Sequence, residues 1–244
     1  RRNTKRLTIA MLKKKKTNKK EIINNIIERC QRNQMNSLTK IDKKTNTKYL
    51  GPLNDVFDKG ETHVGIKSQL GSGKSYALWN FIKNLPNNVI IVSVVHRVSL
   101  KKSIEQKYRE LGFEMYDEIT GEIWTNKHKR ILIQYESLRR LRTKQVIDYL
   151  ILDEINSIGS QTLSKLGVDH IITLYRWEQI CRESKHVLAM DGNLSDNIVN
   201  SLNVICSSNK KENKFYVWEN ETPDLLTPLI CICDNEAVWQ KRLI

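Results

Sequence analysis

Residues 68–75, Ser-Gln-Leu-Gly-Ser-Gly-Lys-Ser, combine residue types that bind phosphate. Glycines allow successive backbone N–H groups to turn toward one anion, and the N-terminus of a following helix adds its dipole. Lys74 would neutralise the β- and γ-phosphates of a nucleotide, and the Ser75 hydroxyl would ligate Mg²⁺. The loop itself would supply the rest of the phosphate cradle: Ser68, Gly71, Ser72 and Gly73. The general pattern opens with glycine rather than serine, and a Gly-rich turn with a chance lysine is the alternative.

Acidic residues follow two apolar runs further along the chain. Asp153 and Glu154 come directly after Asp148–Leu152, and Asp191 follows His186–Met190. Because ligands of open α/β sheets bind at the carboxyl ends of strands, we expect these carboxylates beside the phosphate loop. Asp153 would hold Mg²⁺, directly or through water, and Glu154 would orient and deprotonate an attacking water. Asp191 would lie near the γ-phosphate or cap the next helix, and a solvated acidic turn is the alternative for the pair.

The elements that would position these residues alternate between strand and helix from Glu61 onward. This alternation predicts an α/β fold, with a mostly parallel sheet and helices on both faces. Strands are predicted over 63–67, 88–95, 113–116, 130–134, 148–152 and 186–190, with strand-like pieces near 203–206, 214–218 and 228–233. Helices are predicted over 76–82, 98–111, 136–141, two stretches within 156–184, 193–202 and 236–243. The long apolar run at 88–95 suits a buried central strand.

The positive charge is concentrated toward the N-terminal end. The net charge is +14 over 244 residues, and residues 1–50 carry 16 Lys and Arg against 3 acidic residues, so the remainder is nearly neutral. Such asymmetry indicates an arm that binds a polyanion. The lysine-rich residues 13–20 would serve as a nucleic-acid contact or a nuclear localisation signal. A solvated leader without a fixed partner is the alternative.

Three segments are predicted from these patterns. Residues 1–60 would form a basic arm, mostly helical or disordered, followed by a polar linker over 36–60. Residues 61–206 would form the α/β lobe, and residues 207–244 a connection toward a second lobe. Within the arm, apolar residues recur at helical spacing over 21–32, which predicts an amphipathic helix that needs a partner surface.

Cysteine usage and hydropathy narrow the class of protein. Five cysteines without regular spacing favour a reducing, intracellular compartment. Cys231 and Cys233 fall in an apolar run typical of a buried strand, and no second Cys or His pair has the spacing of zinc ligands. The longest apolar run, Val89–Val95, is far shorter than a membrane span, so no membrane partner is expected. A nuclear, an organellar and a viral replication site all remain open.

Five segments, in order, resemble the first motor lobe of superfamily 2 helicases, and specifically the herpesvirus-type replication origin-binding proteins. The phosphate loop is similar to that family's Ser-x-Met-Gly-Ser-Gly-Lys-Thr form, including the opening serine. Residues 133–141, Ile-Gln-Tyr-Glu-Ser-Leu-Arg-Arg-Leu, resemble its Gln-x-Glu-Ser-Leu-x-Arg segment. Three further segments resemble its other motifs: 92–100, 152–157 and 189–194. The resemblance covers residues 62–205.

The resemblance implies a RecA-like P-loop lobe that binds and hydrolyses ATP with Mg²⁺ and binds DNA. ATP and Mg²⁺ would be handled by Lys74, Ser75, Asp153 and Glu154. Single-stranded nucleic acid would be contacted, or its binding relayed to the ATP site, by four residues: Arg97, Ser99, Gln134 and Ser137. Asp191 and Asn193 would couple hydrolysis to movement, with Asn193 standing where many members have Thr. Binding of the origin duplex would belong to a separate region of such a protein.

The resemblance also implies a second lobe. Superfamily 2 helicases place ATP between two lobes, and the second supplies an arginine finger worth on the order of 10³–10⁵ in rate. After residue 205 only Arg242 is a candidate, and it lacks a motif. We therefore expect this chain to bind Mg-ATP and to hydrolyse it slowly. Two alternatives are another P-loop ATPase or kinase, and a non-enzymatic DNA-binding module that uses the basic arm. The oligomeric state is not indicated.

Overall fold

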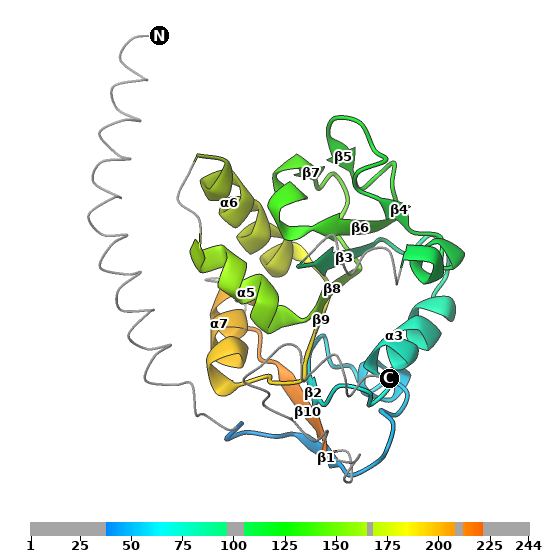
Figure 1. Ribbon diagram of the computed structural model, residues 1–244, viewed down its shortest axis with the longest axis vertical. Coiled ribbons are helices and arrows are strands. Elements are labelled where there is room, and N and C mark those ends of the chain that lie inside the picture. Colours follow the sequence, from blue (N-terminus) through cyan, green and yellow to red (C-terminus); the bar gives the residue numbers. More distant parts are fainter. Residues whose placement is uncertain (1–37, 97–104, 165–167, 208–211, 222–244) are drawn as a thin grey trace, which may run out of the picture.

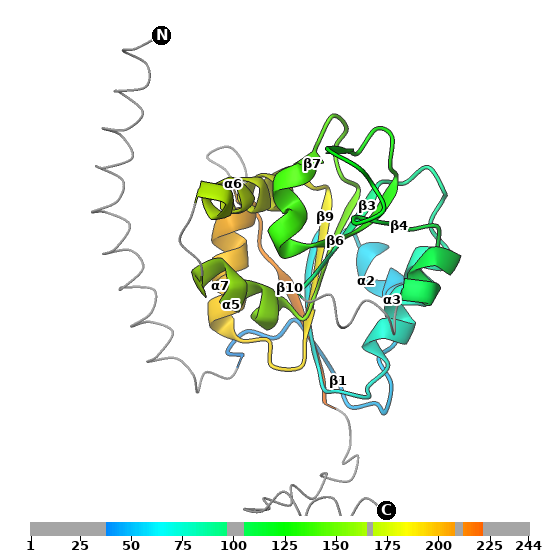
Figure 2. The same ribbon diagram turned by 45° about the horizontal axis from the view of Figure 1, so that its top comes forward.

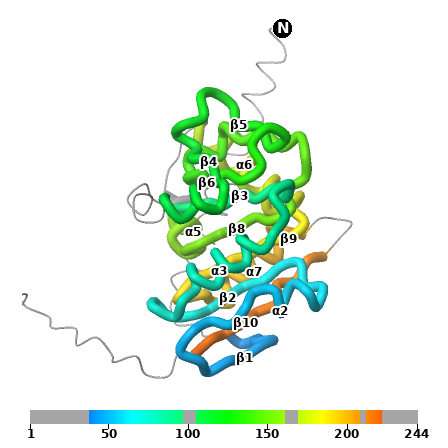
Figure 3. The backbone as a smooth tube through the Cα atoms, turned by 90° about the vertical axis from the view of Figure 1, so that its right-hand side faces the viewer, coloured from blue at the N-terminus to red at the C-terminus, as the bar shows by residue number. Residues whose placement is uncertain are grey.

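The computed structural model describes residues 38–96, 105–164, 168–207 and 212–221. Its main sheet has eight strands: β1 (Lys43–Thr45), β2 (His63–Ser68), β3 (Ile91–Val95), β4 (Glu114–Met115), β6 (Arg130–Gln134), β8 (Tyr149–Asp153), β9 (His186–Asp191) and β10 (Tyr216–Asn220). They lie in the order β1-β10-β2-β9-β8-β3-β6-β4, and every pair is parallel (Figure 1). Figure 3 shows these strands stacked as a ladder across the molecule.

Helices cover both faces of this sheet, as the sequence predicted. They are α2 (Asn54–Phe57), α3 (Lys74–Lys83), the 3₁₀ helix η1 (Tyr135–Arg140), α5 (Ile155–Ser164), α6 (Val168–Glu183) and α7 (Asp196–Cys206). Figure 2 shows α2 and α3 on one face and α5, α6 and α7 on the other. Each face has its own apolar core, one built around Phe81 and Trp218 and the other around Trp177 and Leu202. The α/β fold of the RecA-like type is confirmed.

Burial on both faces explains why the central strands are apolar throughout. All five residues of β3 are buried, and β8 and β9 are buried almost throughout. A parallel sheet covered on both sides has no solvent-facing residues in its centre, so its strands lack alternation. The described part of β3 is shorter than the predicted run, because residues 88–90 form the loop that enters the strand.

Two expectations about the flanks of the lobe were wrong, and one pair of strands inside the lobe was not expected. Residues 36–60, expected to be a linker, contain β1 and α2. Residues 203–206, expected to be strand-like, are the last turn of α7. A second, two-stranded parallel sheet was not expected at all, and it pairs β5 (Ile123–Trp124) with β7 (Leu141–Arg142).

The edge of the sheet beside the phosphate loop is closed by chain segments far apart in the sequence. Strand β10 lies between β1 and β2, so the sheet takes strands from both sides of residues 61–206. Asn220 accepts hydrogen bonds from the hydroxyls of Thr45 (2.8 Å) and Thr47 (2.9 Å). Trp218 is 1% exposed and donates its indole N–H to Thr45 Oγ1. These side-chain contacts fix β1 to β10 although β1 has only three residues.

Several predictions fall outside the described residues. They concern the basic residues 13–20, the helix over 21–32, Arg97, Ser99, the strand near 228–233, the helix over 236–243 and Arg242. Within the described ranges, no helix combines the length and apolar character needed to cross a membrane.

Candidate functional site

The loop that follows β2 is shaped by its glycines. Gly71 and Gly73 adopt φ angles of 80° and 79°, in the left-handed region that L side chains avoid. Gly73 is the N-cap of α3, and no side chain caps this helix. The N–H groups of its first turn are therefore available for an anion. A Cβ on Gly73 would also lie 3.4 Å from the Tyr49 ring, so a larger residue would meet both backbone strain and a packed neighbour.

The two serines inside the loop hold its shape. Ser68 and Ser72 are 1% and 0% exposed, and their hydroxyls lie 2.7 Å apart, with Ser68 donating. Ser72 Oγ in turn donates to the Gln69 carbonyl at 2.6 Å. Asn220 Nδ2 donates to Ser68 Oγ at 3.4 Å, which ties the loop to β10. The opening serine thus has a structural reason, because glycine would leave Asn220 and Ser72 without this partner.

Lys74 points back into the loop. Its Nζ donates to the carbonyl oxygens of Ser68 and, at 2.8 Å, of Gln69. Partial burial lowers the pKa of Lys74, and the negative charges of Asp153 and Asp191 oppose that shift. The lysine at the start of α3 is therefore close enough to the ends of β8 and β9 to interact with both carboxylates. Ser75, the next residue, is exposed in the first turn of α3.

Asp153 is the last residue of β8. In the sheet, β8 is the neighbour of β9, and β9 lies between β8 and β2. Burial raises the pKa of Asp153 to about 6, and the negative charge of Glu154 adds to the rise. The Lys74 ammonium and a hydrogen bond from the Glu154 N–H (3.1 Å) oppose it. A partly desolvated carboxylate surrounded by other carboxylates is suited to a cation, which would lower its pKa again.

The raised pKa of Asp153 predicts a pH-dependent cost in stability. From its ordinary value of 3.8, the pKa rises to about 6 in the folded protein, so the folded state holds this proton more tightly than the unfolded state. The cost is absent below about pH 4, grows between pH 4 and 6, and is complete above pH 6. Asp153→Asn should therefore stabilise the metal-free protein at pH 7 by up to about 3 kcal/mol and have little effect at pH 4.

Urea unfolding of the variant and the parent protein in EDTA, at pH 4 and pH 7, checks this expectation. The Asn side chain keeps an oxygen that accepts from the Glu154 N–H. An Asp153→Asn stability difference that is the same at both pH values would contradict the buried-carboxylate explanation.

Glu154 has an unusual backbone conformation. Its φ is 56°, and among the described residues other than glycine it alone has a positive φ. The left-handed region costs an L residue about 1–2 kcal/mol. The Glu154 carbonyl accepts hydrogen bonds from the N–H groups of Ser157 (2.9 Å) and Ile158 (3.2 Å), which start α5. The exposed Glu154 side chain thus leaves a sharp turn between β8 and α5. Strain at a non-glycine residue is typical of functional positions.

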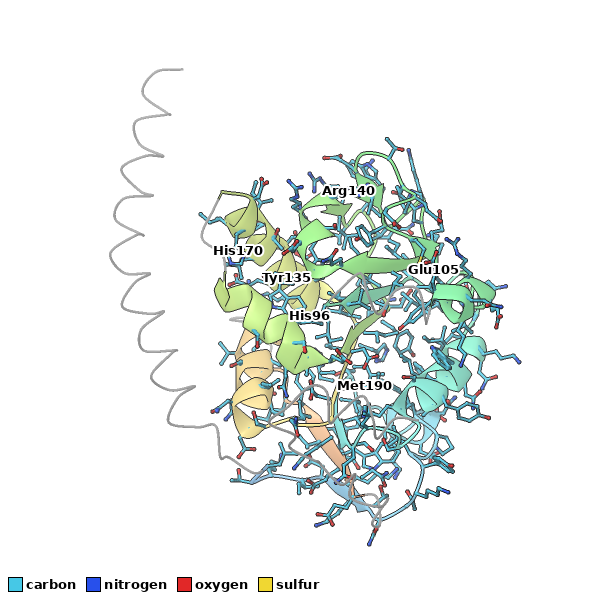
Figure 4. The ribbon with its side chains drawn as sticks, viewed as in Figure 1. His96, Glu105, Tyr135, Arg140, His170 and Met190 are labelled. Atoms are coloured by element: carbon cyan, nitrogen blue, oxygen red, sulfur yellow. The ribbon has the colours of Figure 1, made fainter. Side chains whose placement is uncertain are left out.

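Asp191 anchors the start of α5 from the neighbouring strand. It accepts hydrogen bonds from the backbone N–H of Asn156 (2.9 Å), the side-chain amide of Asn156 (3.0 Å) and the N–H of Asn193 (2.8 Å). It does not cap α7, whose N-cap is Ser195. Gly192 lies beside the phosphate loop, since a Cβ there would be 3.7 Å from the Ser68 carbonyl oxygen. In Figure 4, Met190 lies between the two helical layers immediately before Asp191.

Removing the Asp191 carboxylate should destabilise the lobe. Asp191→Ala leaves two backbone N–H groups and an amide without their acceptor, so we expect a loss of about 2–4 kcal/mol in the free energy of unfolding. Asp169→Ala is the matched control, because Asp169 is exposed and its carboxylate pairs with Arg139 at the surface. Its expected cost is about 0–1 kcal/mol. Equal losses for the two variants in urea unfolding would refute the anchoring role of Asp191.

The candidate nucleic-acid residues are placed in part. Gln134 ends β6, and its side-chain oxygen accepts a hydrogen bond from the Tyr116 hydroxyl at 2.8 Å. Ser137 lies in η1, which directly follows β6. Arg97 and Ser99 lie outside the described residues, immediately after β3, the neighbour of both β6 and β8 in the sheet. The site at β8 and the residues of η1 are therefore separated by the width of one strand.

Sequence reasoning missed Asn156. This residue binds Asp191 and also donates to the Asn193 carbonyl at 3.0 Å, so it joins the ends of β8 and β9. Its side-chain oxygen is buried, with no hydrogen-bond partner among the described residues. Position 156 is two residues after the carboxylate pair, and nothing in the local sequence distinguishes it from an ordinary helical residue.

Among the described residues, no group of three or more His, Cys, Asp or Glu side chains is arranged to hold a metal ion. Mg²⁺ at nucleotide sites is commonly held by one or two protein oxygens together with substrate phosphates and water. Ser75 and Asp153 are the residues that fit this more limited role. The two described cysteines, Cys181 and Cys206, are buried free thiols remote from it.

Comparison with known proteins finds similar proteins in several viruses. A family model described as "Origin of replication binding protein" matches residues 24–213. The chain is 32% identical over 137 residues to the replication origin-binding protein of human herpesvirus 6A, which covers 55% of this chain and 17% of that protein. It is 31% identical over 144 residues to a protein of African swine fever virus named "Putative helicase/primase complex protein", which covers 56% of this chain and 13% of that protein. It is 26% identical over 220 residues to a protein named as a helicase in Acanthamoeba polyphaga mimivirus, covering 81% and 20%.

The fold and the site define a parallel α/β protein of the RecA-like type, with a Gly-rich lysine loop and strand-end carboxylates at one edge of the sheet. The family match spans most of the chain, so the chain belongs to the origin of replication binding protein family, a helicase-like family of replication proteins. The resemblance stated from the motifs is thereby confirmed. The chain spans between 13% and 20% of the length of the three relatives.

Proposed function

We propose that this chain is the ATP-binding motor lobe of a replication helicase, in which Mg-ATP binding and hydrolysis are coupled to single-stranded DNA. The observation that carries the proposal is the position of Lys74, whose ammonium donates to two carbonyl oxygens of the loop and lies close enough to Asp153, Asp191 and Glu154 for their charges to act on it. A cation at the start of α3 and acidic residues at the ends of two neighbouring strands form the two halves of a nucleotide hydrolase site.

The residues of the loop fit the phosphates of a nucleoside triphosphate. The uncapped first turn of α3 offers backbone N–H groups to phosphate oxygens. Lys74 is held inside the loop by two carbonyl oxygens, which it would exchange for the β- and γ-phosphates. Gly71 and Gly73 adopt positive φ angles and carry no side chain that could obstruct a phosphate. Bound Mg²⁺ would neutralise charge on the phosphates, and Ser75 and Asp153 are the residues that would hold it.

The side chain of Glu154 is proposed to act as the general base. It is exposed at the mouth of the site, next to the partly buried Asp153, and would orient a water molecule and accept its proton. Asp191 and Asn156 hold the start of α5 and thereby the turn that carries Glu154. A change in the β9 loop would reach Glu154 through these hydrogen bonds, which makes Asn193 a suitable relay between hydrolysis and movement.

Two observations support DNA binding by this lobe: the names of two relatives, and the positions of four candidate residues relative to the strands of the sheet. Two of the relatives are named for origin binding and for a helicase/primase complex, and both names imply work on DNA. Gln134 ends β6 and Ser137 lies in η1 directly after it, so both lie near the same end of the sheet as Asp153, which ends β8. In the sequence, Arg97 and Ser99 follow β3, the strand between β6 and β8. We propose that the residues after β3 and β6 bind single-stranded DNA. Strand β3 lies between β6 and β8 and would transmit DNA binding to Asp153 at the end of β8. Binding of an origin duplex is assigned to parts of the protein outside this lobe.

The test is equilibrium binding of a fluorescent ATP analogue with Mg²⁺, with and without a single-stranded oligonucleotide. We expect binding that requires Mg²⁺ and an affinity that changes when the oligonucleotide is present, because coupled sites alter each other's affinity reciprocally. Nucleotide binding that DNA leaves unchanged would instead support another P-loop ATPase or a kinase. DNA binding without any nucleotide binding would leave a non-enzymatic module based on the basic arm.

A further inference from the structure

Exposed apolar side chains gather around the phosphate-binding loop. Of the eight large apolar side chains that are exposed in the described residues, three belong to the loop or its immediate surroundings: Tyr49 (59% exposed), Leu70 (92%) and Tyr76 (67%). Leu70 lies in the loop, Tyr76 follows Ser75 in the first turn of α3, and Tyr49 lies between β1 and α2. Phosphate oxygens are bound by N–H groups and cations, so these side chains have no role toward phosphate. An exposed apolar surface is instead suited to a second, apolar part of a ligand.

The Tyr49 ring lies against the glycine that caps α3. A Cβ placed on Gly73 would be 3.4 Å from Cδ1 of Tyr49 and 3.8 Å from its Cβ. The ring thus packs next to the first turn of α3, whose N–H groups no side chain caps. More than half of Tyr49 nevertheless remains exposed. Lys48 Nζ lies 5.3 Å from the ring centroid, but Lys48 is itself exposed, and a contact of this kind is weak enough to give way to a base.

Hydrogen bonds to the backbone fix the chain on both sides of Tyr49. The Leu50 N–H donates to the Ser72 carbonyl in the loop at 2.8 Å, and the Leu50 side chain is buried. Asn220 Nδ2 donates to the Thr47 carbonyl at 3.0 Å, which holds the same segment to β10. Neither bond involves the Tyr49 ring. The fold therefore holds an aromatic ring beside the loop, and removal of the ring leaves these bonds in place.

We propose that Tyr49 is the platform on which the base of the bound nucleoside triphosphate stacks. The inference rests on the proposed nucleotide function, because phosphates held by the loop bring the base to its surroundings through the ribose. A base and a tyrosine ring stack through their π-faces, and stacking removes exposed ring surface from water. Leu70 has no π-face. The Tyr49 ring is already held against Gly73, so stacking on it loses little conformational freedom.

Two ligands that both carry a chain of phosphates test this placement, because Mg-ATP has a base and Mg-tripolyphosphate has none. Isothermal titration calorimetry of the full chain measures the affinity for each ligand. The variants are Tyr49→Ala, which removes the ring, and Tyr49→Phe, which keeps it. Tyr175→Ala is the matched control, because Tyr175 is 66% exposed on α6, on the opposite face of the sheet from α3 (Figure 2). Tyr76→Ala tests the other exposed tyrosine near the loop.

We expect Tyr49→Ala to weaken binding of Mg-ATP by at least about fivefold, the lower end of the range for stacking of a base on an aromatic side chain. Its affinity for Mg-tripolyphosphate should stay within about twofold of the parent value, because the loop is unchanged. Phenylalanine keeps the π-face, so Tyr49→Phe should bind Mg-ATP within about twofold of the parent protein, as should Tyr175→Ala.

Three results would overturn the proposal. Equal weakening of both ligands by Tyr49→Ala would show that Tyr49 shapes the loop and does not hold the base. An unchanged affinity of Tyr49→Ala for Mg-ATP would show that the ring does not contact the nucleotide. A loss of Mg-ATP affinity confined to Tyr76→Ala would place the base on α3. Failure of the proposed function is recognised separately, because the parent protein would then bind neither ligand, and the platform would fall with it.

Discussion

Lys74→Ala is expected to weaken binding of Mg-ATP by about 10- to 150-fold. The reason is that charge-assisted hydrogen bonds contribute about 1.5–3 kcal/mol each, and alanine removes the only loop side chain that can supply one. Among the described residues, the Lys74 ammonium donates hydrogen bonds to carbonyl oxygens of its own loop, so its removal should leave the fold intact. Titration of a fluorescent ATP analogue with the folded variant measures the effect.

The matched control for this variant is Lys83→Ala. Lys83 lies in the last turn of the same helix α3 and is exposed, so its removal changes the net charge equally without touching the loop. Its affinity for Mg-ATP should stay within about twofold of the parent value, a difference of less than ~0.5 kcal/mol. Equal weakening by the two substitutions would show that general charge, and not the loop, attracts the nucleotide.

Glu154→Gln should separate hydrolysis from binding. Glutamine has the size of glutamate but cannot accept the proton of the attacking water, and loss of a general base costs about 10²–10⁴ in rate. The affinity for Mg-ATP should change little, because Glu154 is not expected to contact the phosphates. Single-turnover hydrolysis in the presence of single-stranded DNA measures the rate, and a binding titration on the same sample measures the affinity.

Glu110→Gln is the corresponding control, since Glu110 is an exposed glutamate at the end of the helical residues 105–110 and accepts a hydrogen bond from the side chain of Gln106. It should hydrolyse ATP at the parent rate. If Glu154→Gln also retained the parent rate, the general base would have to be another residue. If it lost nucleotide affinity as strongly as Lys74→Ala, Glu154 would belong to the binding site.

The parts of the fold that the sequence predicted are those where a single physical cause dominates. Strands β3, β6, β8 and β9 are buried on both faces, and a strand buried in this way needs apolar residues at successive positions. The missed elements lack such a run. Strand β1 is three residues long with polar side chains, and the contacts that place it come from Asn220 and Trp218. Val204 and Ile205 looked like a strand, but they continue the helical period of α7.

For the candidate site, too, the sequence pointed to some features and not to others. The loop and the carboxylates could be identified because their residue types are unusual in sequence. The contacts among them could not, because they depend on which strands are neighbours and in what register. Asn156 meets Asp191 only because β8 and β9 are adjacent. The left-handed backbone conformation at Glu154 could not be predicted either, because the residue is not a glycine.

The hydrogen bond between Asn220 and Ser68 has a consequence for folding of the chain during its synthesis. The two residues are 152 positions apart, and β10 must insert between β1 and β2 before Asn220 can reach the loop. During synthesis from the N-terminus, the loop sequence therefore leaves the ribosome long before the strand that completes its setting. Long-range pairing of this kind is slow to form. A nascent chain that stops before residue 216 would carry the whole loop sequence and lack its finished geometry.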